Sequence, residues 1–132
     1  MHNQRKAEAA KRDREIAQHH REQQITKFLD SDALMGSKVQ AIRKRLKSAI
    51  VQHDRELARL DEAYSRANRS PQRDPQYNRL VSSRASLKNS LDDLDARIES
   101  AMLKRATGNA ADSLIWSTDD MQAVDSLYVN CY

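Results

Sequence analysis

Two stripes of mostly apolar residues at heptad spacing lie on either side of the Pro-containing segment 70–75, and they constrain the fold of this chain most strongly. Their members recur at steps of three and four residues, as on the contact face of a coiled-coil helix. We call the members of both stripes the seam residues. The first stripe contains Val39, Ile42, Leu46, Ile50, His53, Leu57, Leu60, Tyr64 and Ala67, and the second contains Tyr77, Leu80, Arg84, Leu87, Leu91, Leu94, Ile98, Met102 and Arg105.

The two stripes are mirror images of each other about segment 70–75. If the chain folds back there, each seam residue faces a partner such that the two residue numbers sum to 144. This register places Arg84 opposite Leu60, with Glu56 and Asp61 within reach. The sequence therefore predicts an all-α fold built around an antiparallel two-helix coiled-coil hairpin.

Helix-end signals support the same boundaries. Ser37 and Gln40 form a capping-box pattern directly after Gly36, a residue that commonly terminates helices. Asp74 and Pro75 are suited to the N-cap and the first helical position of the second hairpin helix. The end of that helix carries residues typical of helix C-termini, namely Lys104, Arg105 and Gly108.

The composition agrees with a few long helices. The chain has only two Gly and two Pro residues, which is too few for the many turns of an all-β or α/β fold. We expect a polar, charged N-terminal helix within residues 1–36, the hairpin within 37–107 with its loop at about 69–75, and an acidic C-terminal segment, 108–132, with a short helix. The run Ser117-Thr118-Asp119-Asp120 is the N-cap signal for that short helix.

Charge is divided unevenly along the chain. From residue 108 onward there are no Lys or Arg residues but four acids, Asp112, Asp119, Asp120 and Asp125. Because the whole chain carries +4, residues 1–107 carry +8. This asymmetry predicts that the acidic segment docks on the basic body, within one chain or between copies.

The C-terminal segment also carries the candidate partner-binding residues. A compact apolar group precedes the short helix, and one apolar face follows on it; together these residues are Leu114, Ile115, Trp116, Met121, Val124 and Tyr128. Aromatic residues are frequent energetic centres of interfaces. The sequence allows two arrangements of Trp116, on a partner or folded back on its own chain.

The densest basic cluster is the candidate site for an anionic partner: Arg43, Lys44, Arg45 and Lys47. Such a cluster could neutralise nucleic-acid phosphates, but aromatic interleaving and a recognisable nucleic-acid motif are missing. A solvated helix face, or a dock for an acidic segment, is the favoured interpretation. Asp92, Asp93 and Asp95 are likewise expected to solvate their helix.

No catalytic, cofactor or metal site is predicted. His19 and His20 are adjacent and therefore point about 100° apart on a helix, which suits chelation of one metal poorly. Cys131 is the only cysteine, so an internal disulfide is excluded. No apolar run is long enough to span a membrane, and residues 1–15 lack the apolar core of a secretory signal. We expect a cytoplasmic location or a place within a virion.

These observations favour a non-enzymatic structural or adaptor subunit of a larger assembly, acting through coiled-coil and C-terminal contacts with copies of itself or other subunits. Long cysteine-poor helical chains occur in bacteriophage tails and cores, so a virion component is the preferred example, by analogy of architecture alone. The alternatives are a basic nucleic-acid-binding accessory and a helical assembly or secretion chaperone. No small-molecule substrate is expected.

Overall fold

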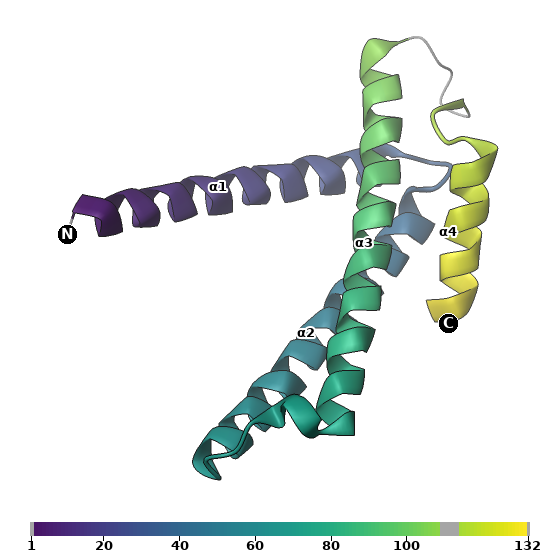
Figure 1. The fold of residues 1–132 in the computed structure, drawn as a ribbon. Helices are drawn as coiled ribbons and strands as arrows, with labels where there is room; N and C mark the ends of the chain where they lie inside the picture. The colour runs from purple at the N-terminus through teal and green to yellow at the C-terminus, as the bar shows by residue number, and fades with distance from the viewer. Residues whose placement is uncertain (1, 109–113, 132) are drawn as a thin grey trace.

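The computed structural model describes residues 2–108 and 114–131 (Figure 1). Within these ranges the chain is helical and contains no strand, which confirms the all-α prediction. The elements are α1 (His2–Ser31), α2 (Gly36–Arg66), the short 3-10 helix η1 (Pro71–Arg73), α3 (Pro75–Thr107) and α4 (Thr118–Cys131). Helices α2 and α3 run antiparallel, α1 crosses them near one end, and α4 lies beside the same end (Figure 1).

The hairpin of α2 and α3 uses the predicted faces. All seam residues except Ala67 are buried or half-buried. Asp74 is the N-cap of α3, and its carboxylate accepts a hydrogen bond from the backbone N–H of Gln76 at 2.9 Å. Pro75 occupies the first turn, and Gly108 ends the helix in the left-handed conformation with φ of 67°. The heptad pattern and these caps therefore identified the hairpin helices correctly.

The register of the hairpin differs from the predicted one. Arg84 binds Asp54 rather than facing Leu60 near Glu56 and Asp61. The cross-helix pairs Arg43–Asp95, Asp54–Arg84 and Tyr64–Asp74 each sum to 138, so the observed pairing is displaced by about one heptad from the sum of 144.

The position of the turn explains the displacement. The prediction centred the turn within residues 70–75, whereas α2 already ends at Arg66 and the chain reverses at residues 67–70. The short helix η1 then packs against α2. The hydroxyl of Tyr64 donates to the carboxylate of Asp74 at 2.7 Å, which holds residues 71–74 alongside α2.

The connection between α1 and α2 depends on Gly36, but for a different reason than predicted. Helix α2 begins at Gly36 with Met35 as its N-cap, so Ser37 does not form a capping box. The Gln40 amide instead donates to the carboxylate of Asp30 at 2.6 Å. A Cβ atom on Gly36 would lie 2.0 Å from the backbone oxygen of Leu29. Glycine at this position therefore permits close approach of the two helices.

Substituting Gly36 with alanine is expected to destabilise the fold by about 2 kcal/mol, because the backbone clash outweighs the higher helix propensity of alanine. Urea unfolding followed by circular dichroism measures the change. Ser37→Ala is the matched control and is expected to be nearly neutral, because Ser37 is exposed and caps nothing. A cost of about 1 kcal/mol for Ser37→Ala would instead support the capping box.

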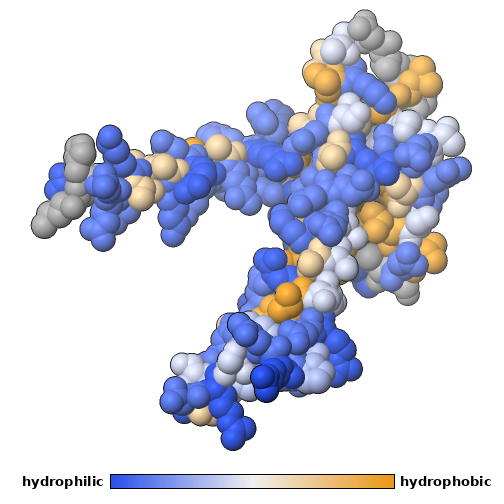
Figure 2. All heavy atoms as spheres, in the orientation of Figure 1, coloured by the Kyte–Doolittle hydropathy of each residue, from blue (hydrophilic) through white to orange (hydrophobic). Residues whose placement is uncertain are grey.

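The buried residues of the described chain lie where the four α-helices meet, a region that we call the helix junction. Its buried apolar residues come from every α-helix, the connection between α1 and α2, and the segment before α4: Ile25, Phe28, Leu29, Met35, Val39, Ile42, Leu46, Ile50, Leu91, Leu94, Ile98, Ala101, Ile115, Trp116 and Val124. Residues 51–90 contain no buried residue, and residues 3–20 are all exposed. The chain thus consists of one junction with two projections, an N-terminal arm (residues 3–20) and the outer part of the hairpin (Figures 1 and 2).

Candidate functional site

Trp116, the centre of the predicted partner-binding segment, lies inside the helix junction of its own chain. Its side chain is 1% exposed, and its indole N–H donates to the Asp32 carboxylate at 2.7 Å. The ring of Phe28 lies 6.2 Å away, centroid to centroid, at an angle of 45°. Of the two arrangements that the sequence allowed, the structure has the internal one.

The remaining residues of that predicted segment divide between core and surface. Ile115 and Val124 are buried completely, and Met121 is half-buried against the core. Leu114 and Tyr128 stay on the surface, with 65% and 36% exposure. Of the six predicted residues, only Leu114 therefore presents most of its side chain to a partner, and Tyr128 presents about a third.

The acidic C-terminal segment docks on the basic body, as the charge asymmetry predicted. Arg97 of α3 donates to Asp119 at 2.9 Å and to Asp120 at 2.8 Å, at the start of α4. Lys38 of α2 binds Asp125 at 2.7 Å. Hydrogen bonds to Asp119, and to Asp93 and Asp120, raise the pKa of Arg97 above its usual value. The docking occurs within one chain, while Asp112 lies outside the described residues.

The N-terminal end of α4 contains the cap that the sequence indicated. The Ser117 hydroxyl accepts from the backbone N–H of Asp120 at 3.0 Å, and Asp120 accepts from the backbone N–H of Ser117 at 3.4 Å. This reciprocal pair fixes the carboxylate of Asp120 next to Arg97. The side chain of Asp120 therefore takes part both in capping α4 and in docking the acidic C-terminal segment on α3.

The predicted basic cluster is divided by a buried ion network. Arg43 is only 7% exposed, and its guanidinium binds Glu22 of α1 at 2.5 and 2.7 Å and Asp95 of α3 at 2.8 and 3.2 Å. Lys47 also binds Glu22, at 2.8 Å. Arg43 thus joins three helices and is not part of a surface site for an anionic partner. Lys44 and Arg45 remain exposed.

The expectation that Asp92, Asp93 and Asp95 all solvate their helix is wrong for Asp95. Asp92 and Asp93 are exposed and bind Lys88 and Arg97 on their own helix, as solvating residues do. Asp95 is 8% exposed and belongs to the ion network. Its position next to Leu94 on the seam, opposite Arg43, was the signal that could have identified it. The register predicted from the sequence paired Asp95 with a different residue, so the signal was missed.

The ion network holds Glu22 in its charged form. The hydrogen bond from Arg43, assisted by Lys47 and opposed by partial burial, lowers the pKa of Glu22 from 4.5 to about 2. The pKa of Arg43 is raised above its usual value, because its bonds to Glu22 and Asp95 outweigh the opposing effect of burial.

Because the folded-state pKa of Glu22 is depressed, its contribution to stability is present above about pH 4.5 and is lost as the pH falls towards 2. We expect Glu22→Gln to cost about 1–2 kcal/mol at pH 7, after allowing for the partial exposure of this side chain. The difference between variant and native protein should narrow between pH 5 and pH 2.5, as Trp116 fluorescence in urea titrations can measure. A difference that stays constant over this range would contradict the network.

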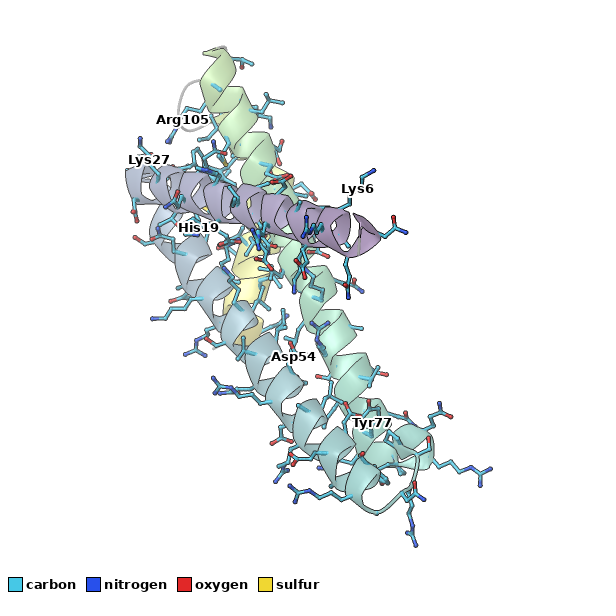
Figure 3. The ribbon with its side chains drawn as sticks, turned by 90° about the vertical axis from the view of Figure 1, so that its left-hand side faces the viewer. Lys6, His19, Lys27, Asp54, Tyr77 and Arg105 are labelled. Atoms are coloured by element: carbon cyan, nitrogen blue, oxygen red, sulfur yellow. The ribbon has the colours of Figure 1, made fainter. Side chains whose placement is uncertain are left out.

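The surface of the described residues carries shallow, open grooves. One of about 790 Å³ lies between α2, α3 and the end of α4, and its lining includes Lys44, Leu87 and Asn130. Another of about 630 Å³ lies between α1 and α3, beside Phe28 and Met102. No group of three or more His, Cys, Asp or Glu side chains suited to a metal ion occurs in residues that the structure describes. His19 and His20 are both exposed on the side of the projecting helix (Figure 3 labels His19).

In the described part of the chain, no helix combines the length and apolar character needed to cross a bilayer. Comparison with known proteins gives no family model, no curated sequence and no solved structure that matches this chain.

Proposed function

We propose that this protein is a non-enzymatic structural or adaptor subunit of a larger assembly, which contacts other protein subunits through its two helical projections. The observation that carries the proposal is the N-terminal arm, in which residues 3–20 are all exposed although they are helical. A helical segment that packs on nothing has little to stabilise it in water, because most helical stability in proteins comes from packing. A partner that packs on the arm would supply that stabilisation.

The arm has a surface suited to another helix. Small and apolar residues recur at heptad spacing as Ala9 with Ile16 and Ala10 with Ala17, and Ile16 is 57% exposed. Small side chains allow a second helix to approach closely, and the surrounding charges can select its orientation. The outer hairpin offers a second surface, where Val51 and Val81 are 46% and 45% exposed.

The absence of an enzymatic role is part of the proposal and is supported by how the acidic side chains are used. Glu22, Asp95 and Asp120 are paired with Arg43 or Arg97, and Asp32 holds the Trp116 indole. Ion-pair networks that hold a fold together also perturb such groups, so the pairing of these carboxylates is explained without a catalytic role. A cellular interior or a virion particle would accommodate such a subunit, and the virion remains the preferred example by analogy alone.

Size-exclusion light scattering with circular dichroism tests the proposal, at low salt and at about 500 mM salt, where exposed charges are largely screened. We expect an oligomer that persists at high salt and dissociates in Ala10→Pro, which breaks the arm at an exposed position. The helix junction should melt at the same temperature in both proteins. A monomer at both salt concentrations, with or without the substitution, would contradict assembly through the arm.

A further inference from the structure

The cationic residues between Lys47 and Lys88, in the outer part of the hairpin, are all arginines. Residues 48–87 contain seven Arg residues and no Lys, whereas Lys occurs directly before and after this range, at Lys47 and Lys88. Four of the seven surround the turn: Arg66, Arg69, Arg73 and Arg79. We call residues 66–79 the hairpin tip. With Asp74 as its only acid, the tip carries a net charge of +3.

The arginines of the tip are exposed and largely uncommitted. Arg69 and Arg73 form no ion pair within the described ranges 2–108 and 114–131. Arg79 donates only a long bond, 3.4 Å, to the backbone oxygen of Pro75, and Arg66 pairs with Glu62 while its own side chain is 79% exposed. At this end of the molecule, marked by Tyr77 in Figure 3, nitrogen-tipped side chains project into solvent in several directions.

The acids near the tip are occupied by internal contacts. Asp74 accepts from the Tyr64 hydroxyl at 2.7 Å and caps α3, and Asp61 accepts from the Tyr77 hydroxyl. Hydrogen bonding to Tyr64 lowers the pKa of Asp74, so this carboxylate stays charged but faces the helix pair. A third nearby acid, Glu62, pairs with Arg66, so Arg69 and Arg73 are the tip arginines that pair with no acid in the described ranges.

We propose that the hairpin tip binds double-stranded nucleic acid through backbone phosphates, without reading the bases. Arginine presents a planar fork of donors that matches phosphate oxygens in pairs, and it is less strongly hydrated than lysine. Arg69 and Arg73, which pair with no acid in the described part of the chain, lie together on one projecting end and suit a polyanion with closely spaced phosphates.

The surroundings of the arginines favour duplex nucleic acid over other partners that would use such charge. Single-stranded nucleic acid is bound through exposed aromatic rings, whereas Tyr64 and Tyr77 are half-buried with engaged hydroxyls. A protein interface needs an apolar centre, and none of the exposed large apolar residues lies within residues 66–79. The same lack of apolar residues disfavours insertion into a lipid surface.

This activity goes beyond the proposed structural role and uses a different part of the molecule from the N-terminal arm. It is also distinct from the predicted basic cluster, where Arg43 is buried and Lys47 is bound to Glu22. A subunit built in this way would hold protein partners along the N-terminal arm and the side of the outer hairpin, where Val51 and Val81 are exposed, and nucleic acid at the hairpin tip.

Fluorescence anisotropy of a labelled, mixed-sequence DNA duplex, and of the same duplex as RNA, tests the proposal with the full chain. The native protein should bind at about 50 mM salt and lose affinity steeply by about 200 mM. Arg69→Gln with Arg73→Gln should weaken binding at least tenfold and reduce the slope of log K against log salt by about 2. Arg69→Lys with Arg73→Lys should restore part of the loss.

The matched control removes two exposed cations from the N-terminal arm, as Lys11→Gln with Arg12→Gln, and should leave duplex affinity within about twofold. Dependence of either duplex on Arg69 and Arg73 supports the proposal, and the tighter duplex identifies the preferred backbone. An equal loss in the control, no loss in the tip variant, or equally tight and equally arginine-dependent binding of polyglutamate would overturn it. Because none of these substitutions removes an ion pair seen among the described residues, unchanged circular dichroism is expected throughout.

Discussion

Replacing Arg43 with methionine is expected to destabilise the folded chain by about 3–5 kcal/mol. The methionine fills similar space, but it leaves the carboxylate of Asp95, whose side chain is only 11% exposed, without its cation. Breaking one side of a buried ion pair costs far more than forming the pair gains, because the remaining charge is desolvated and uncompensated. Glu22 is affected less, since it keeps Lys47 at 2.8 Å. Urea unfolding at pH 7, followed by Trp116 fluorescence, measures the loss.

The double substitution Arg43→Met with Asp95→Leu separates this effect from a packing defect. Replacing both partners with apolar residues of similar size should recover most of the lost stability, as it does for buried ion pairs in general. The exposed neighbour Lys44→Met is expected to change stability by no more than about 0.5 kcal/mol. A double variant as unstable as Arg43→Met alone would show that Asp95 is not the source of the penalty.

Trp116→Ala is expected to cost about 3–5 kcal/mol, the usual range for removing a buried tryptophan. The substitution empties a site that is 1% exposed and removes the indole donor from the buried Asp32 carboxylate. Because Trp116 connects the segment before α4 to the end of α1, we also expect α4 to dock less firmly on α2 and α3. Circular dichroism in a thermal or urea titration measures the change, since this substitution removes the only tryptophan.

The neighbouring Leu114→Ala is the matched control, because Leu114 is 65% exposed and should tolerate truncation within about 0.5 kcal/mol. The loss of stability in Trp116→Phe should lie between those of Trp116→Ala and Leu114→Ala, since the variant keeps a ring near Phe28 but loses the hydrogen bond to Asp32. If Trp116→Ala were as harmless as Leu114→Ala, the indole would have to reside outside this chain's core, on a partner.

The hairpin was predictable because its signals are local and periodic. Heptad spacing identified the buried faces of α2 and α3, and Asp74, Pro75 and Gly108 marked helix ends through their own backbone chemistry. The register was not predictable from the same pattern. A heptad stripe matches its partner almost as well when shifted by seven residues, and the turn at 67–70 with η1 decides between the two.

The contacts that assemble the helix junction were harder to predict. Glu22, Arg43 and Asp95 are far apart in the sequence, and each resembles an ordinary surface charge when read alone. Gly36 resembled a helix terminator, because a sequence does not reveal the Leu29 carbonyl that occupies the space of a side chain. The arginines of the hairpin tip can be read from the sequence. Whether nearby acids pair with them cannot, because this depends on the contacts of Asp74 and Asp61 with tyrosines in the fold.

The buried contact between Trp116 and Asp32 also sets the order in which the chain can acquire its structure during synthesis. The hairpin joins segments that are neighbours in the chain, so it can form as soon as α3 has left the ribosome. Ile115, Trp116 and Val124 are made after the other buried apolar residues of the described chain, and until then Phe28 lacks the ring of Trp116 beside it. A nascent chain stalled before residue 115 would therefore display a folded hairpin beside an open apolar surface, the stage at which a chaperone or an assembly partner has most to recognise.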